Sequence, residues 1–191
     1  MLANDLVTQP VDSDARRAVE IEGLRSSFVA LHGQRLHGFA LLLLLGDEAR
    51  ARELAAASVA AGMENVLALR HPERAAAWLR ADLLRRARRR RDGPPVDGTA
   101  LRRMGVGAAA SDALGALDLA SRAAVIAADV ERLDLRDVHT IVGRSGAAGA
   151  RLLANARRRY VAAFEGPAAA TGPIARRIAA IAATVGRFGS D

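Results

Sequence analysis

Apolar residues recur every three or four positions along most of this chain, the spacing that gathers them on one face of an α-helix. Residues 14–45 follow the pattern and predict one or two helices, with Gly33 and Gly38 as weak points because glycine disfavours a helix interior. The chain shows neither an internal repeat nor a strand-like alternation longer than a few residues. The pattern therefore predicts an all-α fold.

Signals for helix ends divide the N-terminal half. Residues 1–13 have little periodicity and are interpreted as a loose leader. Gly46 stops the first helical stretch, and Asp47 can cap the next one. That helix is rich in alanine and is predicted over residues 48–69, with an interruption near Gly62.

The centre of the chain predicts a domain boundary. Pro72 suits the first turn of a helix over residues 73–91, which would complete a first helical domain, residues 14–91. Residues 92–111 concentrate glycine, proline and small side chains, and they predict a flexible linker. The fold expected is thus two small helical domains joined by this linker.

The second domain, residues 112–165, contains a helix-turn-helix pattern. Two short helices begin it, divided at Asp118, which can cap the second of them. Asp134 can cap the helix that follows, Gly143 can end that helix in the left-handed conformation, and Ser145 can cap the next.

The helix after this turn is predicted to have an apolar face and a basic face. No carboxylate occurs between Asp137 and Glu165, so no neighbour in the sequence opposes an approaching phosphate. A helix, a short turn and a basic helix are typical of a recognition helix in the major groove; the alternative is an αα-hairpin whose arginines are only solvated. The apolar face gathers Leu152, Leu153, Ala156, Tyr160 and Ala163, and the other face gathers Ala147, Arg151, Ala154 and Arg158.

Residues 166–191 predict an amphipathic tail after two Gly-Pro breaks. Ile174, Ile178, Ile181 and Val185 would form one stripe of a last helix. Such a tail could pack on either domain or on a partner.

Composition favours a globular protein with a polyanionic partner. Of the 191 residues, 51% are hydrophobic, which is enough for a packed core. All basic residues are arginine, and 28 of them against 21 acidic residues give a net charge of +7. The alternative is a coding bias toward arginine and alanine, which explains residue choice better than clustering.

Several classes of function are disfavoured. Cysteine is absent, which excludes disulfides and thiolate-bound metals, and no catalytic nucleophile stands beside a plausible base, so we predict neither a metal, a cofactor nor an enzyme. The leucines at 41–45 form an apolar run too short to span a bilayer, and the N-terminus is not signal-like, so a cytoplasmic protein without a membrane partner is expected. The four histidines are scattered without a ligand pattern: His32, His37, His71 and His139.

Six arginines fall among residues 85–91, at the end of the helix predicted over residues 73–91. Because they surround the helix, they cannot all meet a folded core. They indicate contact with a nucleic-acid backbone, or else a solvated helix end that runs into a linker.

Residues 113–143 carry a family resemblance. A leucine-rich helix, an arginine early in the next, an aspartate-valine pair and a hydrophobic-acidic helix follow in order, at Leu114, Leu117, Arg122, Asp129, Val130, Asp137, Val138, Ile141 and Gly143. This order resembles, without gaps, region 4 of the extracytoplasmic-function sigma factors of bacterial RNA polymerase. Ala156 and Arg157 are similar to an alanine-arginine pair near the end of the family's recognition helix.

The N-terminal block, residues 28–62 with 75–91, resembles region 2 of the same family. In the family this part binds the polymerase clamp and opens the −10 promoter element. The resemblance covers most of residues 24–164. It implies core RNA polymerase and promoter DNA as partners, with an anti-sigma factor as a further candidate.

The resemblance also implies contacts in the N-terminal block. Residues 46–66 would dock on the polymerase clamp, with candidate contacts at Asp47, Arg52 and Glu53. Approach to the −10 DNA would fall to Trp78, Arg85, Arg88 and Arg89.

Residues 144–158 would read the −35 element. Base readout is expected from Arg151, because a bidentate arginine specifies a base, whereas Arg144, Arg157 and Arg158 would contact phosphate. Ser145 and Asn155 complete the predicted DNA-binding set.

Some positions depart from the family pattern. His139 replaces a small alanine, and Ala148 and Gly149 replace a threonine-valine pair. Of the carboxylates usual on the family's clamp-binding helix, only the one at Glu53 is left. These departures motivate two alternatives. One is a degenerate sigma mimic or adaptor that binds an anti-sigma-type regulator or polymerase without initiating, and the other is a stand-alone helix-turn-helix regulator.

Overall fold

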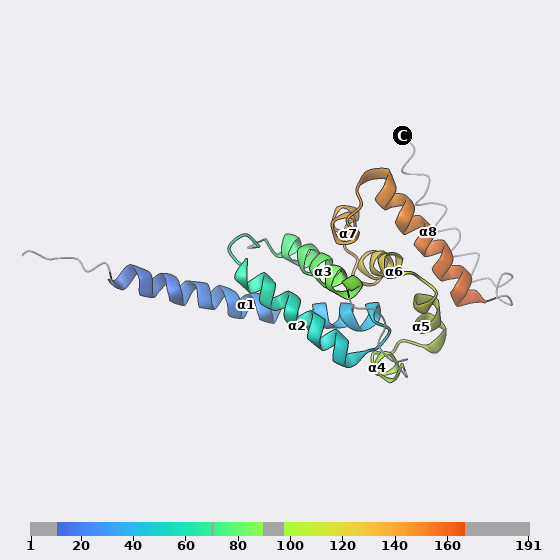
Figure 1. Ribbon diagram of the computed structural model, residues 1–191, viewed down its shortest axis with the longest axis horizontal. Helices are drawn as coiled ribbons and strands as arrows, with labels where there is room; N and C mark the ends of the chain where they lie inside the picture. Colours follow the sequence, from blue (N-terminus) through green and yellow to red (C-terminus); the bar gives the residue numbers. More distant parts are fainter. Residues whose placement is uncertain (1–10, 70, 90–97, 167–191) are drawn as a thin grey trace, which may run out of the picture.

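The computed structural model describes residues 11–69, 71–89 and 98–166, and this part of the chain contains helices and turns but no strand (Figure 1). The all-α prediction is therefore confirmed. None of the helices within these ranges is sufficiently long and apolar to cross a lipid bilayer. In chain order the elements are α1 (Val11–Leu43), α2 (Glu48–Glu64), α3 (Pro72–Arg89), α4 (Thr99–Arg103), α5 (Ala108–Gly115), α6 (Leu119–Val125), a π-helical turn η1 (Ile126–Val130), α7 (Leu135–Val142) and α8 (Gly146–Glu165).

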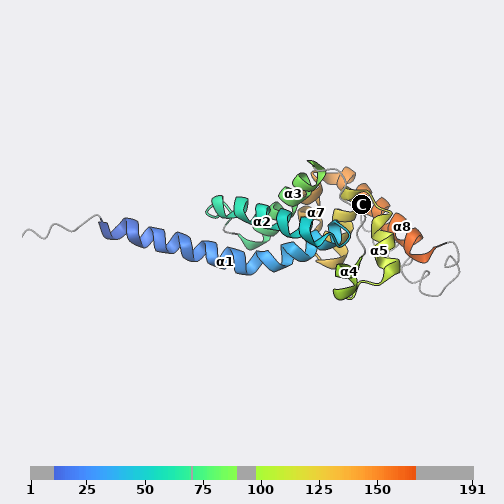
Figure 2. The same ribbon diagram turned by 60° about the horizontal axis from the view of Figure 1, so that its bottom comes forward.

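Helix α1 is continuous and passes through Gly33 and Gly38, the two predicted weak points. It begins at Val11, so the end of the predicted leader already belongs to it. Its N-terminal part extends away from the other helices (Figures 1 and 2), and the Val19 side chain there is 74% exposed. At its other end residues 40–43 and Leu44 directly after the helix are all buried, since α1 contacts α2, α3, α4 and α6. The leucine run is apolar on every face of the helix because other helices pack against every face.

Helix α2 begins where the sequence indicates. The Asp47 side chain accepts a hydrogen bond from the Arg50 amide at 3.0 Å, which confirms it as the N-cap. The helix ends at Glu64, five residues before the predicted end, and Gly62 lies inside it without interrupting it. A Cβ atom at Gly62 would lie 2.8 Å from the Phe28 ring, so this glycine allows α1 and α2 to approach closely.

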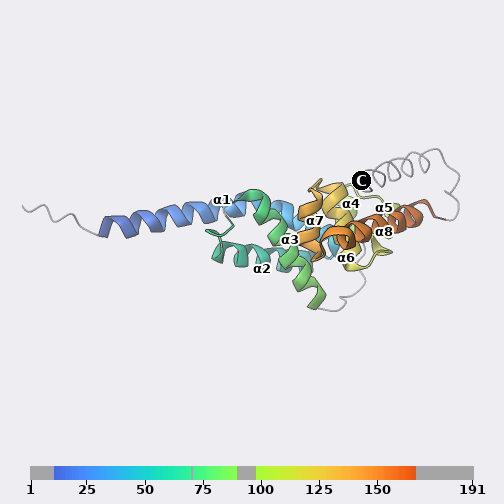
Figure 3. The ribbon, with the colours of Figure 1, turned by 90° about the horizontal axis from the view of Figure 1, so that it is seen from above.

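The two predicted domains share one hydrophobic core. Helix α3 lies against α7 (Figure 3), and α1 contacts η1. Buried side chains from Phe28 to Ala156 form a single cluster. Arg80 of α3 is buried, pairs with Glu131 after η1 through two hydrogen bonds, and lies over the Phe39 ring at 5.6 Å from its centroid. The expected arrangement of two separate helical domains is therefore not confirmed.

A second buried arginine joins helix ends within this core. Arg122 of α6 donates hydrogen bonds to the carbonyl oxygens of Leu43 at 2.6 Å, Leu114 at 2.8 Å and Leu117 at 2.9 Å. Burial lowers the pKa of Arg122, although the charge of Asp118 opposes that shift. Arg122 thereby satisfies carbonyl groups near the C-terminal ends of α1 and α5, where a helix has no partners of its own.

The predicted linker is folded wherever the structure describes it. Residues 90–97 lie outside the described residues, but residues 98–111 contain α4 and the start of α5. Leu101 of α4 is fully buried and lies beside Gly46. Apolar burial therefore makes this part of the predicted linker a packed element of the fold. The predicted tail, residues 167–191, lies outside the described residues.

Candidate nucleic-acid interface

The turn between α7 and α8 has the predicted geometry. Asp134 caps α7 by accepting a hydrogen bond from the Asp137 amide at 2.8 Å. Gly143 has φ of +70°, the left-handed conformation that ends a helix, and its amide donates to the His139 carbonyl at 3.0 Å. Ser145 occupies the N-cap position of α8, but its own side chain makes no capping hydrogen bond, so only its predicted position is confirmed.

Helix α8 has one buried side and one solvent-exposed side. Its inward residues contact α5, α6 and α7. Ala163 was expected on the packed side but is exposed, because it lies in the last turn of the helix. The buried side comprises Gly149, Leu153 and Ala156, with Leu152 and Tyr160 half-buried; the exposed side comprises Ala147, Arg151, Ala154 and Arg158.

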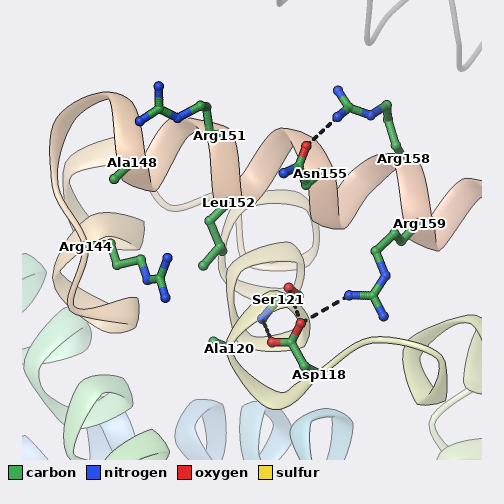
Figure 4. Close-up of a pocket in the computed structure, with 10 residues that line it drawn as sticks. All are labelled: Asp118, Ala120, Ser121, Arg144, Ala148, Arg151, Leu152, Asn155, Arg158 and Arg159. Atoms are coloured by element: carbon green, nitrogen blue, oxygen red, sulfur yellow. Dashed lines mark hydrogen bonds and ion pairs between the residues drawn. The ribbon is translucent and has the colours of Figure 1, made fainter.

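A groove lies between α8, the α7–α8 turn and the start of α6 (Figure 4). We call it the arginine groove. Its lining holds four guanidinium groups and one carboxylate, a net charge of about +3 before any pairing. The lining residues are Asp118, Ala120, Ser121, Arg144, Ala148, Arg151, Leu152, Asn155, Arg158 and Arg159.

The arginines of the groove face two ways. Figure 4 shows Arg159 directed toward Asp118, and Arg151 and Arg158 projecting from the opposite side of α8. The Arg158 guanidinium donates to the Asn155 side-chain oxygen. Arg144 and Arg151 form no ion pair with another described residue and are exposed. Their positive charge is therefore available to a ligand.

Two acidic residues distant in sequence hold α8 in place. Arg157, a predicted phosphate contact, forms a bidentate pair with Asp129 of η1 at 3.0 and 2.6 Å. Arg159 donates to Asp118 at 3.2 Å and to the Ala116 carbonyl at 2.9 Å. No carboxylate neighbours this helix in the sequence, but the fold brings two distant ones, Asp129 and Asp118, against it.

Asp118 is a cap as well as an ion-pair partner. Its carboxylate accepts hydrogen bonds from the Ser121 amide at 2.9 Å and from the Ser121 hydroxyl at 2.8 Å. Burial raises the pKa of Asp118, but the hydrogen bonds from Ser121 and the charge of Arg159 outweigh burial and lower it overall. The carboxylate is consequently charged at neutral pH and neutralises one side of the groove.

The second predicted basic cluster, at the end of α3, is organised differently. Arg85 and Arg86 both pair with the buried carboxylate of Asp82, which lies three and four positions before them on the same helix, about one turn away. Trp78 is half-buried against the core. Arg88 and Arg89 are exposed, and neither lines the arginine groove.

The predicted polymerase contacts lie on α2. Asp47 is occupied as the N-cap, whereas Arg52 and Glu53 lie on the exposed side of the helix. Sequence reasoning missed Arg159, Asp118 and Ser121 as parts of the groove. An arginine run at 157–159 does not indicate which member meets an acid, because the acids come from elements about 30 to 40 residues earlier.

No metal site emerges from the described part of the chain, since no three histidine or acidic side chains converge there. In comparisons with known proteins, the chain matches no family model, no curated protein and no solved structure.

Proposed function

We propose that this chain is a sigma-factor-like DNA-binding protein that directs RNA polymerase to promoters, with α8 as the helix that contacts double-stranded DNA. The observation that supports this most is the division of α8 into a packed side and an exposed side whose Arg151 and Arg158, with Arg144 in the turn, face solvent. Arginine is the residue best suited to phosphate oxygens and to the guanine edge in the major groove.

In this proposal the arginines have two different roles, base recognition and phosphate contact. Arg151, in the second turn of α8, would reach base edges, while Arg144 and Arg158 contact the phosphates on either side. The first amides of α8 would add donors for a phosphate, since the Ser145 side chain does not cap them. Arg157, held by Asp129, would orient α8 rather than contact DNA.

The test is a binding measurement on selected duplexes. Sequences enriched from a random pool by the wild-type protein are titrated by fluorescence anisotropy over a range of salt concentrations. Arg144→Ala and Arg158→Ala should each reduce the magnitude of the log-log salt slope by about 0.9, as expected for one lost phosphate contact. Arg151→Ala should instead relax base preference. Arg17→Ala, an exposed arginine of α1, is the matched control and should change neither quantity.

The polymerase part of the proposal needs its own measurement. Purified chain is mixed with bacterial core RNA polymerase and a template that carries the selected sequence. Co-elution with core enzyme and a transcript from a defined start support the proposal. DNA binding without co-elution would contradict the initiation role and leave a stand-alone regulator.

One observation favours the second candidate, a sigma mimic or adaptor that does not initiate. The region-2-like and region-4-like parts share a core, joined by Arg80 and Glu131 and by the contact between α3 and α7. Two halves fixed in this way cannot span two separated promoter elements unless that core opens. Co-elution with core polymerase without a transcript, or capture of an anti-sigma-type regulator alone, would support this second candidate.

A further inference from the structure

The contact between α7 and α8 depends on a glycine that faces a histidine. Gly149 is buried in the second turn of α8. A Cβ atom built on it would lie 2.3 Å from Cδ2 and 2.6 Å from Nε2 of His139, and 2.7 Å from the carbonyl oxygen of Arg144. Distances this short are not tolerated between non-bonded atoms, so residue 149 can carry no side chain while the ring is in place.

The histidine ring is correspondingly enclosed. His139 lies in α7, and its Nε2 atom is buried without a hydrogen-bond partner among the described residues. The ring therefore contributes to the packing between α7 and α8 through its shape, and its Nε2 atom makes no hydrogen bond there. The His139 carbonyl, in contrast, accepts the amides of both Gly143 and Arg144 at 3.0 and 3.1 Å, so the same residue also fixes the turn.

We propose that His139 and Gly149 form an interlocking pair that sets how α8 lies on α7, and thereby positions Arg144 and Arg151 along the arginine groove. This inference rests on the proposed DNA binding for its consequence, but not for the contact itself. Arg144 is the residue whose carbonyl approaches Gly149, and Arg151 is two residues further along α8. Because that carbonyl oxygen is a backbone atom, a shift that makes room for a Cβ atom at position 149 changes the position of Arg144 relative to α8, which carries Arg151.

The pair also accounts for two departures from the sigma-factor pattern at once. A large residue at 139 and a missing side chain at 149 are each unfavourable alone, because the first would clash and the second would leave a void. In this protein the His139 ring occupies the space that a side chain at position 149 would otherwise fill. His139 and Gly149 are positioning residues, since neither is exposed for contact with DNA in the way that Arg151 is.

The experiment is a double-mutant cycle with two readouts. Gly149→Ala, His139→Ala and the double variant are compared by thermal unfolding and by anisotropy titration with the selected duplex, at a temperature where each variant is folded. Gly149→Ala should lower Tm and weaken DNA binding about tenfold or more. In the His139→Ala background the same substitution should lower Tm by less than half as much, because two of the three clashing atoms belong to the ring.

Gly23→Ala is the matched control. A Cβ atom at Gly23, on α1, meets nothing within 4 Å, so the same substitution should leave Tm unchanged or raise it, and should leave DNA affinity unchanged. If Gly149→Ala does not fold, His139→Ala alone removes the ring without adding atoms and is expected to unfold cooperatively while binding DNA more weakly.

Equal losses of Tm for Gly149→Ala in both backgrounds would overturn the interlocking pair. A folded Gly149→Ala protein with wild-type DNA affinity would overturn its positioning role. If the wild-type chain binds no duplex, the proposed function fails, whereas the Tm cycle still decides whether the pair interlocks.

Discussion

Helices α3 and α8 are both rich in arginine, and they differ in where the acids that pair with their arginines lie: on α3 and after η1 for α3, and on other elements for Arg157 and Arg159 of α8. On α3, Arg80 is buried against Glu131, and Arg85 and Arg86 share the buried carboxylate of Asp82. On α8, Arg151 projects to solvent without an ion pair to any described residue. The difference arises from the position of the acids. It teaches that the number of arginines on a helix does not measure the charge that the helix offers to a partner.

The largest expected effect concerns the buried pair on α3. Arg80→Met removes the charge that compensates Glu131, whose side chain is only 16% exposed. We expect a loss of about 3–5 kcal/mol in the free energy of unfolding, measured by urea denaturation, because a buried carboxylate is left unpaired. Arg151→Met, the matched change on α8, should stay within about 0.5 kcal/mol. Similar losses for the two variants would remove the contrast between the helices.

The next largest effect is expected from removing the acid on α3, which would leave partly exposed arginines without an ion pair, as Arg151 is on α8. Asp82→Asn removes the carboxylate shared by Arg85 and Arg86, and we expect a loss of about 1–2 kcal/mol in unfolding free energy, reduced by the partial exposure of both arginines. The two released guanidinium groups should raise affinity for duplex DNA at low salt. Asp112→Asn changes the net charge equally at an exposed position of α5 and should not alter stability. An unchanged stability of Asp82→Asn would show that its pairing contributes nothing.

A smaller effect is expected from the pair that holds α8 to η1. A double-mutant cycle of Arg157→Ala and Asp129→Ala should give a coupling energy of about 0.5–1 kcal/mol, since the pair is bidentate but partly exposed. Arg25 and Glu22, an exposed pair at 3.7 Å within α1, should give a coupling near zero. Equal coupling in both cycles would mean that Asp129 does not orient α8.

The smallest effect is a dependence on pH. Because the folded protein lowers the pKa of Asp118 below its usual value of 3.8, the charged carboxylate contributes stability above about pH 4, and this contribution is lost as the pH falls through the lowered pKa. Unfolding of wild type and Asp118→Asn across acidic pH should therefore show a difference that shrinks toward lower pH. If the difference in stability between wild type and Asp118→Asn instead grew as the pH fell, the pKa of Asp118 would be raised by folding and not lowered.

The local elements were predictable because their signals are local. Asp47, Asp118 and Asp134 each cap the helix that the sequence assigns to them, and Gly143 has the positive φ that the turn requires. A cap needs only three neighbouring residues, so the sequence contains all the information. The exposed face of α8 was predictable for the same reason, because helical periodicity decides which residues share a side.

The associations between distant segments were not predictable in this way. Nothing in the sequence near Leu101 distinguishes a packed α4 from the flexible linker expected there, since burial is decided by Gly46 and α1. The pairing of Arg157 with Asp129, and the space shared by His139 and Gly149, likewise follow from how helices cross. Periodicity identifies a face but does not state which surface will cover it.

The long first helix has a consequence for local opening. From Ala15 to Ser27 none of its residues is buried, whereas residues 40–44 are enclosed on all sides. With 33 residues, the helix spans about 50 Å. Its backbone amides should therefore exchange with solvent in a gradient, rapidly at the free end and only on global unfolding beside the leucines.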